Sequence, residues 1–209
     1  MIRFLMQTLL IATATAWAPP PDAVRLEVLL EKTIFQVDVI ALDLWLGPTS
    51  VAQVRRLCAT PEEAAADAGR ASRDSLAAII ASSRDARVRV VFQRDVSLDR
   101  FLDGVITDMR RAQGAGLLGA EGFQHVASGL PVWLAPLRAE GLHEGDRFLY
   151  RIAGDTLRTR VERAGGAVVI DQTDVGVEHR RALLGSLVAP GGGFTDQLLD
   201  QLPRRVCAP

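Results

Sequence analysis

The sequence predicts an α+β domain in which an antiparallel sheet carries helices on one face. Three short β-branched segments follow one another at 145–154, 155–166 and 167–173, separated by Gly-Asp and Gly-Gly turns. Turns of this kind are typical of β-hairpins and predict an antiparallel meander. The expected order is strand, helices, strand, helices, three strands and helices, an arrangement that favours helices packed together on one side of the sheet.

The remaining elements follow from hydrophobic periodicity and helix-capping signals. An apolar stretch at 24–46 predicts one or two strands and stops at Gly47-Pro48. The clearest helix begins behind Ser97, where apolar residues recur at helical spacing as far as Met109. The other expected elements are helices at 49–57 and 59–83, a strand at 86–94, a helical region at 117–139 broken at Pro131, and closing helices at 176–190 and 193–202.

Composition limits the classes of function. A chain of 209 residues with 48% hydrophobic and 23% charged residues is that of one folded domain. Its net charge of −1 provides no basic surface for nucleic acid, so we expect no nucleic-acid partner.

The N-terminus resembles an export signal. Arg3 precedes an apolar run, and small residues at Ala14, Ala16 and Ala18 offer A-x-A cleavage patterns. We therefore expect residues 1–18 to act as a signal peptide, cut after Ala16 or Ala18, and the mature protein to be periplasmic or secreted. No later segment is apolar and long enough to predict a membrane span.

A Pro-rich lead-in at 19–25 is expected to precede a single domain at 26–209. Cys58 and Cys207 are the only cysteines. Export would allow a disulfide between them, but the sequence leaves open whether they pair or stay as small buried side chains.

The sequence contains no motif typical of a catalytic group, a metal site or a cofactor site. The glycines at 191–193 precede a helix but lack the Lys-Ser/Thr of a phosphate loop, and no G-x-S-x-G is present. The three histidines have no zinc-ligand spacing. His125 lies on an apolar helix, where it could ligate haem or simply be a hydrogen-bonded histidine at the edge of the core.

Four segments, taken in order, resemble the bacterial chalcone isomerase-like family: "EKTIFQVDVIALDLWLGP", "VRVVFQRDVSLDRFLDGV", "EGLHEGDRFLYRIAGD" and "HRRALLGSLVAP". The similarity extends over roughly residues 26–202. It implies an open-faced β-sandwich, in which a helical layer and the sheet enclose an apolar cleft.

The residues of this chain at the family's catalytic positions argue against catalysis. Plant enzymes of this fold hold their substrate with an arginine, a threonine, a tyrosine and an asparagine. In this chain those positions fall near Lys32, Asp38, Leu98 and Val105, and the chain has no asparagine. Losing several positioned hydrogen-bond donors, each worth about 10²–10³ in rate, would leave little activity.

We therefore expect a non-catalytic protein that binds a small apolar or amphipathic molecule, fatty acid-like or flavonoid-like, in the cleft. Lys32, the only lysine, and Asp38 are the candidate ligand-binding residues. Strand alternation places Asp38 with Leu42 and Leu44 on one face and Asp43 on the other, so the two carboxylates do not form a catalytic pair. The alternatives are an intramolecular lyase or isomerase with a divergent site, and a haem-binding protein that uses His125.

Overall fold

The computed structural model describes residues 17–19, 21–31, 38–59 and 66–207. In this part of the chain, six strands form one antiparallel sheet in which each strand pairs with the one before it in sequence. The strands are β1 (Val24–Glu31), β2 (Asp38–Leu46), β3 (Asp85–Phe92), β4 (Arg147–Ala153), β5 (Thr156–Glu162) and β6 (Val168–Val175). The apolar stretch at 24–46 is therefore two strands, and the predicted meander corresponds to β4–β6.

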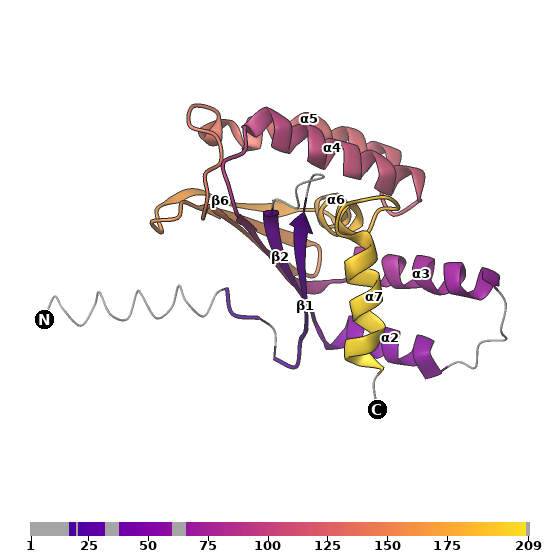
Figure 1. Cartoon of the computed structure of the whole chain (residues 1–209). Coiled ribbons are helices and arrows are strands. Elements are labelled where there is room, and N and C mark those ends of the chain that lie inside the picture. Colours follow the sequence, from indigo (N-terminus) through magenta and orange to yellow (C-terminus); the bar gives the residue numbers. More distant parts are fainter. Residues whose placement is uncertain (1–16, 20, 32–37, 60–65, 208–209) are drawn as a thin grey trace, which may run out of the picture.

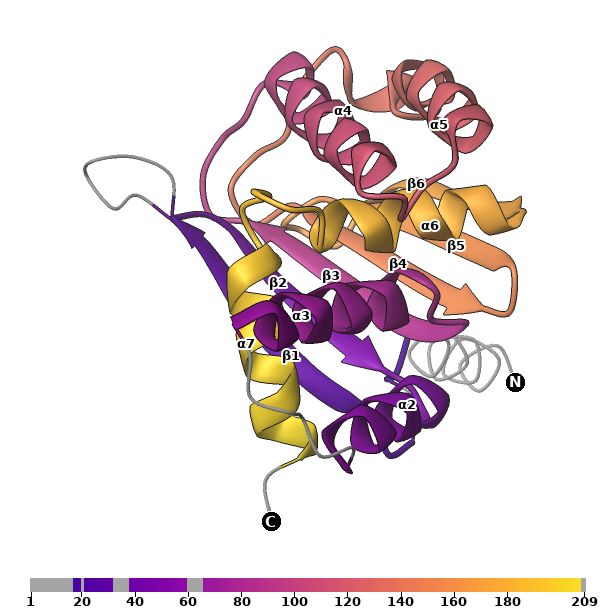
Figure 2. The ribbon, with the colours of Figure 1, turned by 90° about the vertical axis from the view of Figure 1, so that its right-hand side faces the viewer.

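Helices cover one face of the sheet, as Figures 1 and 2 show. They are α2 (Pro48–Ala59), α3 (Ala66–Ala81), α4 (Leu98–Gly114), α5 (Ala120–Trp133), the short 3₁₀ helix η1 (Ala135–Leu137), α6 (Val177–Leu187) and α7 (Thr195–Val206). α6 contacts α3, α4, α5 and β5, and α7 contacts β1, so α6 connects the sheet to the outer helices α4 and α5. The expected α+β fold, an antiparallel sheet with helices on one face, is confirmed.

One helix boundary differs from the expectation. Pro131 does not break α5, which continues to Trp133 before its C-cap at Leu134. The proline lies in the last turn, where its missing N–H removes only one backbone hydrogen bond and the helix is about to end.

The core lies between the sheet and the helices. Along β3 every second side chain is buried, namely Ala86, Val88, Val90 and Phe92. Phe92 and Phe148 are almost fully buried and contact Phe101 of α4, with ring centroids 5.3–5.7 Å apart. These aromatic contacts anchor the start of α4 against the sheet.

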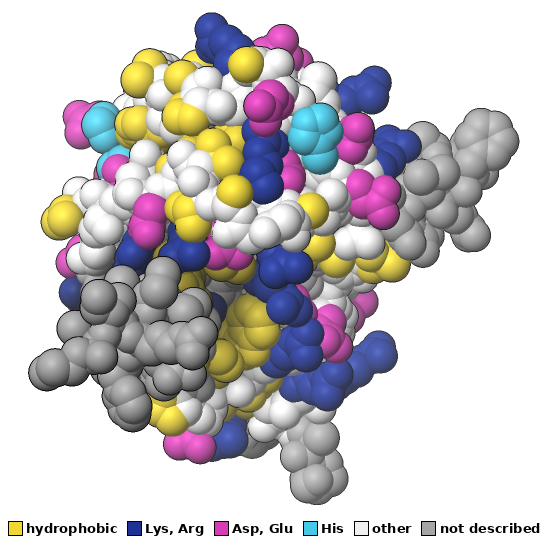
Figure 3. Space-filling view, turned by 90° about the vertical axis from the view of Figure 1, so that its left-hand side faces the viewer, with side chains coloured by type: hydrophobic (Ala, Val, Ile, Leu, Met, Phe, Trp, Pro, Cys, Tyr) yellow, Lys and Arg dark blue, Asp and Glu magenta, His cyan; other side chains and the backbone are white. Residues whose placement is uncertain are grey.

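Asp43 lies on the opposite face of the sheet, as strand alternation predicts. Its carboxylate accepts hydrogen bonds from Arg25 on β1 and Arg89 on β3, at 2.6–3.0 Å. Both guanidinium groups also lie over the Trp45 ring, 5.4 and 5.7 Å from its centroid. Figure 3 shows this side of the molecule, where basic side chains run beside a hollow with hydrophobic side chains. The carboxylate is thus paired within the sheet face rather than directed at the cleft.

Cys58 and Cys207 form a disulfide, with a Cα–Cα distance of 6.2 Å. The bond joins the C-terminal end of α2 to the end of α7, and 149 residues separate the two cysteines in sequence. The sequence alone did not decide whether Cys58 and Cys207 pair, and the structure shows that they do.

Candidate ligand-binding cavity

A cavity of about 620 Å³ lies between the sheet and the helices α4, α5 and α6. This volume is in the range of small-molecule sites, about 300–1,000 Å³. Apolar side chains make up much of its wall, among them Leu30, Ile40, Val90, Phe101, Met109 and Leu187. The resemblance implied an apolar cleft between the two layers, and the structure contains one.

The sequence of α4 explains how this wall forms. Ser97 caps the helix by accepting a hydrogen bond from the backbone N–H of Arg100 at 3.3 Å. Phe101, Val105 and Met109 then follow at intervals of four residues and line the cavity from one helix face. The apolar stripe that predicts the helix also supplies the wall of the site.

Apolar side chains occupy the two helix positions that the sequence resemblance matches to the tyrosine and the asparagine of the plant enzymes. Leu98 is buried in the core, and Val105 lines the cavity. Neither side chain can donate a hydrogen bond to a ketone or to its water. The described part of the cavity therefore lacks this pair of donors.

A row of polar side chains crosses the sheet at the floor of the cavity. Tyr150 on β4 is the register partner of Thr159 on β5, and Thr159 is the register partner of Gln172 on β6. All three residues line the cavity. Because direct neighbours on one face of an antiparallel sheet have Cβ atoms about 4.5–5.5 Å apart, the three polar groups form a continuous patch.

The hydroxyl groups of this patch are not used by the fold. The Tyr150 and Thr159 side chains make no hydrogen bond to another described residue, although Thr159 is only 7% exposed. Gln172 donates one long hydrogen bond, 3.4 Å, to Asp174. Burial raises the pKa of the Tyr150 hydroxyl above its usual range, so this group stays protonated and can donate.

His179 lies beside the row, in the first turn of α6. It is 9% exposed and lines the cavity, and its ring contacts those of Trp133 and His125 at centroid distances of 5.3 and 5.2 Å. Burial lowers the pKa of His179 below 6.5, so its imidazole is neutral at pH 7. His125, the residue considered for haem, is exposed and is not part of the cavity wall.

Charged side chains line another part of the cavity, where β3 leads into α4. Arg94 and Arg100 form no ion pair with any described residue, and the buried Nε of Arg94 has no hydrogen-bond partner there. The nearby acidic residues have other partners: Asp108 pairs with Arg111, and Asp95 contacts His143. The guanidinium groups of Arg94 and Arg100 therefore have no ion-pair partner among the described residues, although Asp95 and Asp108 line the same part of the wall.

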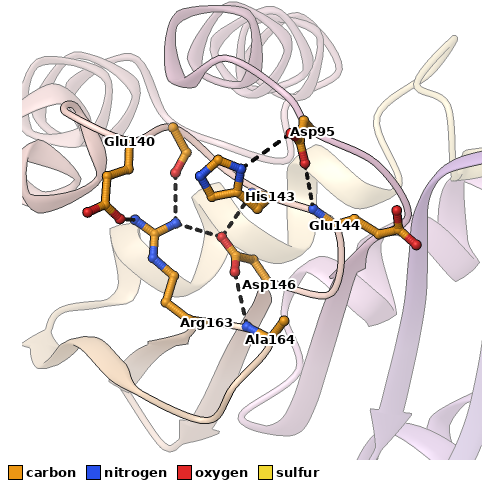
Figure 4. A network of polar contacts seen from close by, with 8 residues as sticks. Asp95, Glu140, His143, Glu144, Asp146, Arg163 and Ala164 are labelled. Carbon is orange, nitrogen blue, oxygen red and sulfur yellow. Dashed lines mark hydrogen bonds and ion pairs between the residues drawn. The ribbon is translucent and has the colours of Figure 1, made fainter.

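A polar network holds the loops at this part of the cavity (Figure 4). Asp146, 1% exposed, accepts hydrogen bonds from the backbone N–H groups of His143 and Ala164 and from Arg163, at 2.7–3.2 Å. Asp95 accepts a hydrogen bond from the backbone N–H of Glu144 at 2.9 Å. That hydrogen bond, with a smaller contribution from His143, lowers the pKa of Asp95. The network ties the β3–α4 connection to the β4–β5–β6 meander and so positions the loop that carries Arg94.

The side chains of the two residues expected to bind ligand lie outside the described part of the chain. Lys32 lies outside the described residues, and Asp38 begins β2 but its side chain is also outside the described part. The sequence patterns did not single out Arg94, Arg100, Thr159, Gln172 or His179 as ligand-binding residues. The signal that could have found the row is a polar residue at the inward phase of three consecutive strands, with Tyr150 between Phe148 and Ile152 as the first example.

The described residues contain no group of three or more His, Cys, Asp or Glu side chains placed to hold a metal ion. Nor do they include a helix with the length and apolar character needed to cross a membrane.

The fold is similar to that in the crystal structure of a fatty-acid binding protein from Arabidopsis thaliana, with a TM-score of 0.54 and 10% sequence identity. The match covers 87% of this chain and 90% of the other. No protein-family model matches the sequence, and no curated protein matches it. At this identity the similarity establishes the fold, an α+β open-faced sheet consistent with the chalcone isomerase-like type, and not the ligand.

Proposed function

We propose that this chain is a non-catalytic member of the chalcone isomerase-like family that binds a small amphipathic acid, fatty acid-like in chemistry. The observation that carries the proposal is the cavity of about 620 Å³, whose wall combines apolar side chains with two arginines that form no ion pair with a described carboxylate. The similar fold of a fatty-acid binding protein supports the same ligand class.

The two parts of the wall give the ligand an orientation. Its carboxylate lies at Arg94 and Arg100, because a guanidinium group forms strong, charge-assisted hydrogen bonds with carboxylates. Its apolar body lies against Phe101, Val105 and Leu187. Each Å² of apolar surface removed from water then contributes about 25 cal/mol to binding, so the hydrocarbon supplies most of the affinity.

The apolar side chains Leu98 and Val105 support a role without catalysis. An intramolecular lyase of this fold needs donors that hold the developing oxyanion, and these positions supply none. A flavonoid-like ligand would occupy the same apolar space, but it does not require the two arginines.

We also propose that the protein is exported. The A-x-A patterns at the N-terminus and the disulfide between Cys58 and Cys207 support an oxidising destination, because such bonds persist outside the cytosol. Intact-mass measurement of protein from the periplasm or medium tests this. We expect a chain that starts at residue 17 or 19, and a full-length chain confined to the cytosol would contradict export.

Calorimetric titration of delipidated protein with dodecanoate tests the ligand class. We expect one saturable site, weakened about tenfold or more in Arg94→Met, since a hydrogen bond to a charged group is worth about 1.5–3 kcal/mol. Arg181→Met is the matched control, because Arg181 is exposed on α6 and is not part of the cavity wall. Absence of saturable binding by the wild-type protein would contradict the proposed function, and equal weakening in both variants would contradict the role of Arg94.

A further inference from the structure

We propose that the Tyr150–Thr159–Gln172 row is a second polar subsite, which recognises a neutral oxygen, a hydroxyl or keto group, on the ligand's hydrocarbon chain. The inference rests on the proposed function and names a narrower ligand class, the oxygenated amphipathic acid. The juxtaposition that carries it is three polar side chains on neighbouring strands, all facing one cavity.

The Tyr150–Thr159–Gln172 row has hydrogen-bonding groups that a ligand can use. Thr159 is more than nine-tenths buried, and its hydroxyl makes no hydrogen bond to another described residue. A ligand that covers a polar group without bonding to it leaves that group unpaired at a cost of about 1–3 kcal/mol, so a ligand that fills this cavity is expected to bond to the Thr159 hydroxyl. A plain alkyl chain laid across this floor would cover the hydroxyl without satisfying it.

On β4 and β5, the Tyr150 and Thr159 side chains lie between apolar neighbours. On the same face, Phe148 and Ile152 flank Tyr150, while Leu157 and Val161 flank Thr159. The hydroxyls are therefore isolated at one level of the sheet and define a specific point along a bound chain. A cavity built only to hold hydrocarbon would continue the apolar layer.

Tyr150, Thr159 and Gln172 are uncharged, and the neighbouring His179 is neutral at pH 7 because burial lowers its pKa. Asp174, which also lines the cavity, would repel a carboxylate there. The row therefore suits a neutral oxygen, whereas the carboxylate belongs at Arg94 and Arg100.

The hydrogen-bonding chemistry of the row fits either form of neutral oxygen. The protonated Tyr150 hydroxyl donates, and the Thr159 hydroxyl and the Gln172 amide can each donate or accept. A keto oxygen would accept from these donors, and a ligand hydroxyl could also donate to Thr159 or Gln172. Sites that hydrogen-bond a ligand hydroxyl discriminate strongly against the analogue without it, because their own polar groups are then left unpaired.

The test compares dodecanoate with a positional series of hydroxydodecanoates by calorimetry on the delipidated protein. We expect at least one isomer to bind about threefold to tenfold more tightly than dodecanoate, as one buried hydrogen bond would give. That advantage should disappear in Thr159→Val, which keeps the branched shape, and shrink in Tyr150→Phe. Thr173→Val is the matched control, because Thr173 is exposed on the other face of β6.

The outcomes separate this inference from the proposed function. If dodecanoate binds and no hydroxy isomer binds more tightly, the subsite is refuted and the ligand class stands. If an isomer gains affinity equally in the wild type, Thr159→Val and Tyr150→Phe, the row is not the site of recognition and the inference fails. If neither dodecanoate nor any isomer binds, the proposed function fails first.

Discussion

Arg163 pairs with two carboxylates of very different exposure, which allows a sharp test of how this fold is stabilised. Its Nη1 lies 2.7 Å from Asp146, whose side chain is 1% exposed, and its Nη2 lies 2.8 Å from Glu140, whose side chain is 69% exposed. Asp146→Asn replaces one carboxylate oxygen with an NH2 group and leaves the Arg163 guanidinium without its buried negative partner. Breaking a buried pair from one side costs about 3–5 kcal/mol, whereas an exposed pair is worth about 0–1 kcal/mol.

Urea unfolding of Asp146→Asn and Glu140→Gln, followed by circular dichroism, measures the difference. We expect the free energy of unfolding to fall by about 3–5 kcal/mol in the first variant and by at most about 1 kcal/mol in the second. Both changes convert a carboxylate to its amide. The two variants therefore differ in the burial of the side chain and in the two backbone N–H hydrogen bonds that only Asp146 accepts. Equal losses in the two variants would refute the reasoning.

Three further predictions concern stability. Replacing Cys58 and Cys207 by serine should lower the free energy of unfolding by about 2–5 kcal/mol, because the bond closes a long loop, and urea curves without reductant should show it. Phe148→Ala should cost about 3–5 kcal/mol in the same assay, since this nearly inaccessible ring packs against two others, and a loss below about 1 kcal/mol would contradict that packing. Burial lowers the pKa of His179, so the unfolded chain binds a proton at higher pH than the folded chain, and stability should fall as pH drops below about 6.5. His179→Gln should flatten that part of the stability–pH curve, and an unchanged curve would exclude this residue as the cause.

The strands and helices with regular hydrophobic periodicity could be predicted from the sequence. Alternation along 86–94 and the four-residue spacing from Phe101 to Met109 each fix which side chains face the core. Alternation likewise separates Asp43 from Leu42 and Leu44. These patterns are local, so one chain segment is enough to reveal them.

The candidate site depends on relations that no single segment contains. The Tyr150–Thr159–Gln172 row exists only once the registers of two hairpins are fixed, because a shift of one residue would send the polar groups to the other face. The pairing of Cys58 with Cys207 and the position of Arg94 on the cavity wall likewise depend on elements far apart in sequence.

The most direct test of the account is whether filling the cavity abolishes ligand binding. Val105→Trp places a large side chain in the wall of the cavity, and Thr107→Trp places the same side chain on an exposed position of the same helix. In calorimetric titrations with dodecanoate, we expect Val105→Trp to lose saturable binding and Thr107→Trp to retain wild-type affinity, with both variants folded by circular dichroism. Unchanged affinity in a folded Val105→Trp would show that the ligand binds elsewhere and would contradict the account.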